Sequence, residues 1–308
     1  MLQAQTLPIA TETTRRLMPT PGAVQVERLA AGQEMEILGF LSQRPIHTVA
    51  MMSLIRDNGL VNSLNRGAFY ASRDMNGHLE GVALVGHATL IETVSDRALQ
   101  SLALVAQECF DIHMIMGEQD RIEEFWEFCS KAGQTMRRAC RESLLELRWP
   151  VAVHEPATRL HLATAMELDL VIPIQAQMAL EESGINPQDV DPEGFRKRCL
   201  RRIEQGRTWV LLEDDRLIFK ADIISESREV IYLEGVWLSE DKRGTDLGPS
   251  CISSLSRKLL NRSKSLCLLV NQNDKRAQAF YKKCGFLFRA NYETIFLPQK
   301  DRAPKSVN

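Results

Sequence analysis

Residues 232–248 read Tyr-Leu-Glu-Gly-Val-Trp-Leu-Ser-Glu-Asp-Lys-Arg-Gly-Thr-Asp-Leu-Gly, and they decide how the second half of the chain folds. Their apolar and aromatic beginning predicts a strand, and Pro249 directly after them predicts the first turn of a helix. The loop between carries Gly244 and Gly248. Because a helix begins with unpaired N–H groups and a positive dipole end, such a loop can close its backbone around a phosphate. The stretch therefore indicates an anion site, although many strand–loop–helix units carry a glycine.

A second pattern lies downstream. Residues 266–271 read Leu-Cys-Leu-Leu-Val-Asn and predict a buried strand, and a helix containing Ala277 and Phe280-Tyr281 precedes Gly285-Phe286. This order resembles the closing signature of the GNAT superfamily, strand–Asn–x5–Ala–x2–Phe-Tyr–x3–Gly-Phe. Residues 243–248 resemble the pyrophosphate loop of the same family, Arg/Gln-x-x-Gly-x-Gly/Ala, at the usual separation. Residues 155–297 are therefore similar to an acyl-CoA-dependent N-acyltransferase domain.

The resemblance implies a site for acetyl-CoA as co-substrate. Backbone groups of the central strand would pair with the pantetheine arm, and amides of the loop would hold the pyrophosphate. Tyr281 would protonate the departing thiolate, since a phenol with a pKa of ~10 matches a thiolate in basicity; the alternative is an aromatic side chain packed in the core. The implied cofactor-binding residues are Val236, Leu238, Arg243, Gly244, Thr245, Asp246, Leu247, Gly248 and Asn273.

Glu234 is the candidate base that removes a proton from the attacking amine. Alternation along a strand predicts that Glu234, Val236 and Leu238 share one face. A carboxylate on an apolar face is partly desolvated, which raises its pKa. The family often places a base on this strand; the alternative is a glutamate at a strand edge paired with a lysine. Glu181 and Glu182 are weaker candidates on the acceptor side.

Asp246 departs from the family pattern, which has glycine at this place. A carboxylate repels a diphosphate and can cap a helix N-terminus, so its direction matters. Three functions stay open. The first is an N-acetyltransferase that acts on a primary amine, and the second is a non-catalytic module that binds or senses acyl-CoA. The third, an aminoacyl transferase of the peptidoglycan-bridge type with a tRNA donor, conflicts with the retained loop.

The first half repeats the order of elements of the second. At an offset of 155, Phe125–Cys129 falls on Phe280–Cys284, and both follow an apolar strand. We therefore predict an α/β fold with a mixed sheet flanked by helices, present as a tandem of two similar domains. Residues 20–150 form a degenerate GNAT-like domain and residues 155–298 the acetyltransferase domain, with the linker at 149–156. Residues 92–97 lack a glycine, so the first half is expected not to hold CoA and to shape the acceptor cleft.

Periodicity and turn residues place the individual elements. Ser95 is predicted to cap a helix that runs to Glu108. In the second half, helices are predicted at 168–183, 191–205, 249–262 and 274–283, and strands at 160–164, 208–213, 216–224, 230–238, 265–270, 286–289 and 292–297.

Composition limits the remaining choices. The chain has 308 residues and a formal net charge of -2, which argues against a nucleic-acid binder. It has no apolar run of ~20 residues, and residues 1–19 lack the apolar core of a secretory signal. Spacings typical of metal sites are absent, and the seven cysteines suit buried free thiols in a cytoplasmic protein. The expected partner is a small-molecule or peptide amine, with no nucleic acid, membrane or metal, and a homodimer is left open.

Overall fold

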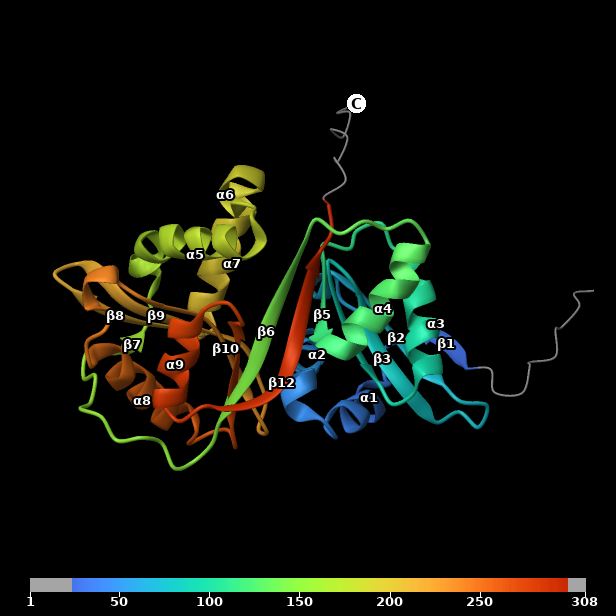
Figure 1. Cartoon of the computed structure of the whole chain (residues 1–308), viewed down its shortest axis with the longest axis horizontal. Helices are drawn as coiled ribbons and strands as arrows, with labels where there is room; N and C mark the ends of the chain where they lie inside the picture. The colour runs from blue at the N-terminus through green and yellow to red at the C-terminus, as the bar shows by residue number, and fades with distance from the viewer. Residues whose placement is uncertain (1–23, 299–308) are drawn as a thin grey trace, which may run out of the picture.

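A computed structural model describes residues 24–298, and its strands form one continuous sheet (Figure 1). The strands are β1 Gln25–Arg28, β2 Gly67–Arg73, β3 Leu79–Gly86, β4 Ala88–Thr93, β5 Met114–Glu118, β6 Arg138–Leu147, β7 His161–Leu162, β8 Thr208–Glu213, β9 Arg216–Glu226, β10 Ile231–Leu238, β11 Leu266–Asn271 and β12 Leu287–Phe296. The helices are α1 Glu34–Leu41, α2 Pro45–Asn58, α3 Asp96–Gln107, α4 Gln119–Lys131, α5 Leu168–Ser183, α6 Pro187–Val190, α7 Pro192–Glu204, α8 Leu247–Leu259 and α9 Lys275–Lys283.

The two halves, β1–β6 and β7–β12, have the same topology. In the first half, β1 to β4 pair antiparallel in turn, and α3 then leads to β5, which pairs parallel with β4. In the second half, β7 to β10 form the same antiparallel series, and α8 leads to β11, parallel with β10. The predicted mixed α/β sheet in tandem is thus confirmed.

The last strand of each half lies in the sheet of the other half. The strand order is β1-β2-β3-β4-β5-β12-β6-β11-β10-β9-β8-β7, so β12 pairs with β5 and β6 pairs with β11. The exchanged strands also pair with each other in antiparallel fashion. Leu287 lies opposite Glu146 at one end of the ladder, and Phe296 lies opposite Arg138 at the other. The predicted linker falls between β6 and β7, but the sheet continues across the junction of the halves (Figure 1).

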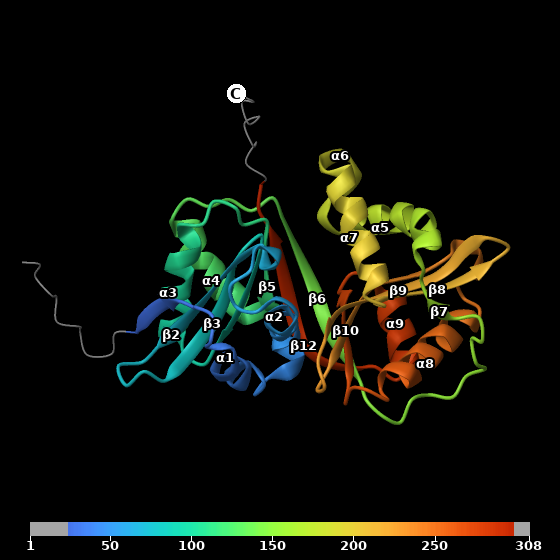
Figure 2. The same ribbon diagram turned by 180° about the vertical axis from the view of Figure 1, so that it is seen from behind.

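Alternating side chains along each strand supply separate cores on the two faces of the sheet. In β3, Ala83 and Val85 pack beneath α3 and α4, whereas Val82 and Leu84 pack beneath α1 and α2 (Figures 1 and 2). In the second half, α8 and α9 cover one core and α5 and α7 the other. Helix α2 also reaches across the junction, where Val49 packs with residues of β6, β10, β11 and β12.

Two elements differ from those predicted. The strands expected at 286–289 and 292–297 are one strand, β12, because a register shift between Phe288 and Ala290 absorbs the apparent break. The short helix α6 was not predicted, although Asn186 caps it and Pro187 begins it. The prediction for residues 1–19 lies outside the described residues.

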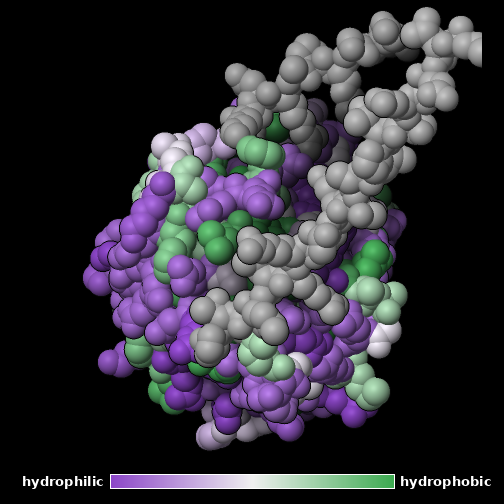
Figure 3. Space-filling view, turned by 90° about the vertical axis from the view of Figure 1, so that its right-hand side faces the viewer, coloured by the Kyte–Doolittle hydropathy of each residue, from purple (hydrophilic) through white to green (hydrophobic). Residues whose placement is uncertain are grey.

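The surface seen in Figure 3 is largely hydrophilic, and the described helices lack long apolar stretches, in agreement with the amino-acid composition. Figure 3 looks onto the end of the molecule formed by the first half, where hydrophilic residues predominate and hydrophobic ones form small groups. No helix between residues 24 and 298 has the length and apolar character needed to cross a bilayer. All seven cysteines are free thiols, and six of them are buried.

The exchanged strands predict that the two halves unfold together. Leu99 is fully buried in the first half, and its replacement by Ala should cost about 2–5 kcal/mol. In a Trp126→Phe background the three remaining tryptophans, Trp149, Trp209 and Trp237, all follow β6 in the chain. Urea unfolding followed by their fluorescence should move to a lower midpoint when Leu99→Ala is added. An unchanged midpoint would show that the halves unfold independently.

Candidate functional site

The central strands of the second half separate after a short parallel pairing. Strands β10 and β11 pair only through Ile231 with Leu266 and Tyr232 with Cys267. Both strands continue, β10 to Leu238 and β11 to Asn271. Because backbone N–H and C=O groups on facing edges need partners, this opening can accept an extended ligand that supplies them.

The loop at the end of β10 carries free amides. The backbone N–H groups of Arg243, Thr245 and Leu247 donate hydrogen bonds to acceptors within the loop. The N–H groups between them, which belong to Gly244, Asp246 and Gly248, donate no hydrogen bond to any residue between 24 and 298. Gly244 has a φ of +84° and open space around it. The free amides and the start of α8 together form a concentration of positive partial charge at one end of the opening.

Asp246 makes no hydrogen bond with these amides. Its side chain is 89% exposed, and its nearest cation is the Lys283 ammonium at 3.8 Å. The carboxylate does not cap α8. The residue that breaks the family pattern therefore leaves the first turn of the helix accessible to an anion.

Gly248 and Tyr281 lie where the loop, β10 and α9 meet. A Cβ at Gly248 would lie 3.2 Å from side-chain atoms of both Leu238 and Phe280, so glycine permits this close approach. Tyr281 is buried, with its ring edge-on to Phe280 and to Phe286. Burial raises the pKa of Tyr281 far above its ordinary value, so the phenol keeps its proton.

Asn273 is not brought into this arrangement by any described contact. It is exposed on the turn before α9, and its backbone N–H donates to Asn271 Oδ1 at 2.8 Å. Its assignment to the cofactor stays a prediction.

A bulge in β10 places Glu234 on the other face of the sheet. Glu234 lies opposite Asp222 of β9 and Trp237 lies opposite Lys220, so β10 has one extra residue between these pairs. Gly235 takes a φ of +59° in this bulge. Glu234 therefore shares the face of Trp237, beneath α5 and α7, while Val236 and Leu238 pack beneath α8 and α9.

The expectation that these three residues share one face was thus wrong. Simple alternation fails because the extra residue resets the side-chain pattern. The bulge puts the carboxylate on one side of the strand and the side chains of Val236 and Leu238 on the other.

Two further carboxylates surround Glu234. Burial and the charge of Asp222 raise the pKa of Glu234 against the opposing effect of Arg202 and Lys220. Glu142 of β6 accepts a hydrogen bond from Thr294 Oγ1 at 2.7 Å; burial and the charge of Glu234 raise its pKa to about 6. Like charges held in a partly desolvated site favour a proton or a cation among them.

Glu182, at the end of α5, completes this group. Desolvation of its carboxyl group by nearby protein atoms, and then the charges of Glu234 and Glu142, raise its pKa, although the residue as a whole is exposed. Glu181, the other acceptor-side candidate, is exposed and accepts a hydrogen bond from Gln177 Nε2 at 2.9 Å. Sequence reasoning missed Glu142, because it belongs to the first half and reaches this site only through the exchange of strands.

A groove of about 850 Å³ lies between the two halves. The first half contributes the stacked rings of His87 and His113, with centroids 4.8 Å apart. The second half contributes residues of α5, including Ser183 next to Glu182. Both halves therefore line this groove, whereas Glu142, Glu182 and Glu234 are not among its lining residues.

Comparison with known proteins agrees with this geometry. Residues 221–295 match the family model described as FR47-like protein. A GCN5-related N-acetyltransferase from Sphaerobacter thermophilus is 10% identical, with a TM-score of 0.55 over 90% of this chain and 97% of that one. A tandem GNAT protein from the clavulanic acid biosynthesis pathway is 12% identical, with a TM-score of 0.53 over 90% and 100%. The chain has a tandem GNAT fold.

A third solved structure, a GNAT-family acetyltransferase from Colwellia psychrerythraea, is 11% identical and has a TM-score of 0.52 over 89% of this chain and 100% of that one. No curated protein matches the chain. At these identities the structures establish the fold alone.

The first GNAT-like half has the same opening, but its own side chains fill it. Strands β4 and β5 pair only from Ala88 to Leu90 with Met114 to Met116. Beyond this, Arg44 bridges the two strands through Glu92 at 3.0 Å and Glu118 at 2.6 Å. A guanidinium that joins both strands occupies the place where an extended ligand would have to lie.

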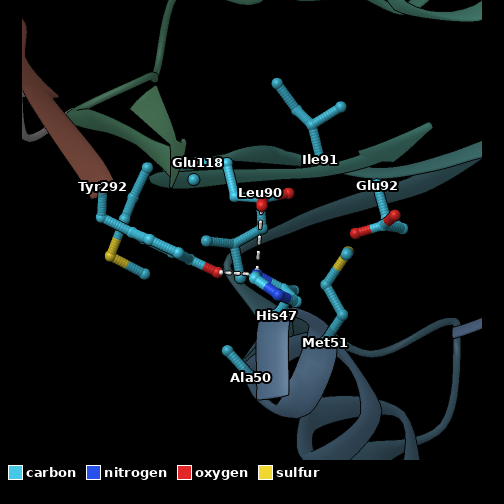
Figure 4. A pocket seen from close by; sticks show the side chains of 10 residues that line it. His47, Ala50, Met51, Leu90, Ile91, Glu92, Glu118 and Tyr292 are labelled. Carbon is cyan, nitrogen blue, oxygen red and sulfur yellow. Dashed lines mark hydrogen bonds and ion pairs between the residues drawn. The ribbon is translucent and has the colours of Figure 1, made fainter. Parts of the chain in front are cut away.

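Side chains of α2 and β12 close what remains of this opening (Figure 4). His47 Nδ1 lies 3.0 Å from the Tyr292 hydroxyl and 3.6 Å from Glu118. The cavity among them measures about 30 Å³, room for little more than a water molecule. One amide in the first turn of α3, that of Ala98, also has a partner, since Ser95 caps the helix as predicted. These contacts support the expectation that the first half does not hold CoA.

The raised pKa of Glu142 makes a testable prediction for stability. Folding raises this pKa from 4.5 to about 6, so ionised Glu142 costs stability increasingly between these pH values and fully above them. Glu142→Gln should therefore stabilise the protein at pH 8 by up to about 2 kcal/mol, and by nothing below pH ~4. Thermal unfolding across this pH range measures the difference. Glu181→Gln is the exposed control, and a Glu142→Gln variant less stable than wild type at pH 8 would contradict the prediction.

Proposed function

We propose that the protein is an N-acetyltransferase that moves an acetyl group from acetyl-CoA to a primary amine by direct attack on the thioester. The observation that carries this proposal is the coincidence of two features in a GNAT fold. The facing edges of β10 and β11 do not pair with each other beyond Tyr232 and Cys267, and the free amides of Gly244, Asp246 and Gly248 lie at the end of that opening.

The residues of the opening suit the shape and charge of acyl-CoA. Backbone groups of Val236 and Leu238 would pair with the pantetheine arm, as an added strand pairs with a sheet edge. The loop amides and the start of α8 would hold the pyrophosphate. Bound there, acetyl-CoA would supply an acetyl group activated as a thioester.

Glu234 would act as the base. An amine is protonated at neutral pH, so it must lose a proton before its nitrogen can attack. The raised pKa of Glu234 brings this carboxylate closer to the range in which it can accept that proton. A cationic amine would stabilise the ionised forms of Glu142 and Glu182 beside it, so the group favours such an amine as acceptor.

Tyr281 would supply the proton for the departing sulfur. Its pKa is raised by burial, so the hydroxyl stays protonated until a strong base forms beside it. The thiolate released as the C–S bond breaks is such a base.

The main alternative is a non-catalytic module that binds or senses acyl-CoA, for which Asp246 was the best feature. The exposure of that carboxylate and its contact with Lys283 weaken this support, because the carboxylate does not cap α8. The carboxylates beside the opening have no role in simple sensing of the cofactor.

Asp246→Gly separates the two functions. Because the carboxylate is exposed, its removal should tighten acetyl-CoA binding only about two- to fivefold, the effect of one surface charge near a helix N-terminus. Calorimetry on both proteins measures this. Wild type that does not bind, together with a variant that binds in the micromolar range, would instead favour the degenerate, non-catalytic relative.

Tyr281→Phe tests the acid. The phenyl ring keeps its edge contacts with Phe280 and Phe286, so acetyl-CoA affinity should change less than about threefold. Thiol release with an amine acceptor should fall by about 100-fold or more, because the proton donor is lost. Calorimetry and a thiol-release assay measure the two quantities. Unchanged turnover would show that Tyr281 is only a core residue.

A further inference from the structure

A buried lysine lies behind the bulge of β10. Lys220 of β9 has no solvent exposure, and its ammonium lies 2.6 Å from Asp222 Oδ2 and 3.3 Å from the carbonyl oxygen of Gly235. Burial of an ammonium is costly unless it is paired and hydrogen-bonded. A buried lysine at this place therefore needs both partners, and one of them is the backbone of the bulge.

The lysine and the glycine fit each other. A Cβ at position 235 would lie 2.8 Å from the Lys220 Nζ atom, and Gly235 takes a φ of +59°. Only glycine both adopts this backbone conformation readily and leaves room for the ammonium. The hydrogen bond fixes the direction of the Gly235 carbonyl, and with it the point at which β10 turns away from regular pairing.

The same ammonium belongs to a buried group of charges next to Glu234. Asp222 also accepts hydrogen bonds from Arg202 at 2.9 Å and from Thr208 at 2.8 Å. Lys220 and Arg202 bring two positive charges, and Asp222 brings one negative charge. The charges of this group sum to zero only when Glu234 is ionised. Glu234 must be ionised before it can accept a proton as a base.

We propose that Lys220 is a positioning residue for acyl transfer: its ammonium holds the bulge that opens β10 and keeps Glu234 ready as an anion. This proposal rests on the proposed function. The groups that act on Glu234 come from five elements: Asp222 and Lys220 of β9, Arg202 of α7, Tyr232 of β10, Glu142 of β6 and Glu182 of α5.

Lys220→Met tests both parts on the full chain. It keeps the length of the side chain but removes the charge and the bond to Gly235. Acetyl-CoA affinity, measured by calorimetry without any acceptor, should fall at least about tenfold as the bulge is released. In thiol release from acetyl-CoA with 1,4-diaminobutane, the acid limb of kcat/KM should move up by about 1 pH unit or more, because Glu234 loses a neighbouring cation. Lys264→Met, an exposed lysine, is the matched control and should change neither quantity.

Asp222→Asn should shift the acid limb of kcat/KM in the opposite direction, and it tests the proposal even if Lys220→Met does not fold. It keeps the shape and the Lys220–Gly235 bond but removes a negative charge beside Glu234, so the acid limb should move down. If Lys220 and Asp222 only stabilised the fold, both substitutions would lower kcat/KM without moving its acid limb in opposite directions. The proposal would be overturned if the acid limb moved in the same direction in both variants. It would also be overturned if the acetyl-CoA affinity of Lys220→Met stayed within twofold of wild type. Wild type that binds no acetyl-CoA would overturn the proposed function and this inference together.

Discussion

The antiparallel pairing of β6 with β12 is the interaction on which the rest of the molecule depends. Each strand belongs by sequence to one half and by position to the sheet of the other. The pair joins two GNAT-like units into one sheet, and it carries Glu142 and Thr294 to the edge of the candidate site in the second half. The site is therefore a property of the whole chain, although its signature motifs all lie after residue 230.

The same topology has opposite results in the two halves. In the second half, the separation of the central strands leaves the amides of Gly244, Asp246 and Gly248 without a partner among residues 24–298. In the first half, Arg44 ties the corresponding strands together, and Tyr292 of the exchanged strand helps to fill the space. One repeat thus keeps the opening as a candidate site, while in the other repeat side chains fill the same opening.

Most of the fold could be read from the sequence, because apolar periodicity, caps and glycine turns are local signals. Helix α5 and strand β8 begin and end where they were predicted. The strand exchange could not be predicted, since nothing local distinguishes pairing within a half from pairing between halves. The loop and Tyr281 follow from motif spacing, whereas the bulge at Gly235 resets the face of Glu234, and Lys220 acts from a neighbouring strand through contacts that no spacing encodes.

The exchanged strands also determine what the segment between β6 and β7 does. Since each half already holds a strand of the other, that connecting segment is not what keeps the two halves together. A protease nick there would leave a noncovalent pair of fragments, interlocked through the central ladder. For the same reason, neither half is a module that recombination could transplant alone: a gene that lost one repeat would lose an interior strand from the other, so the two must be inherited as a unit.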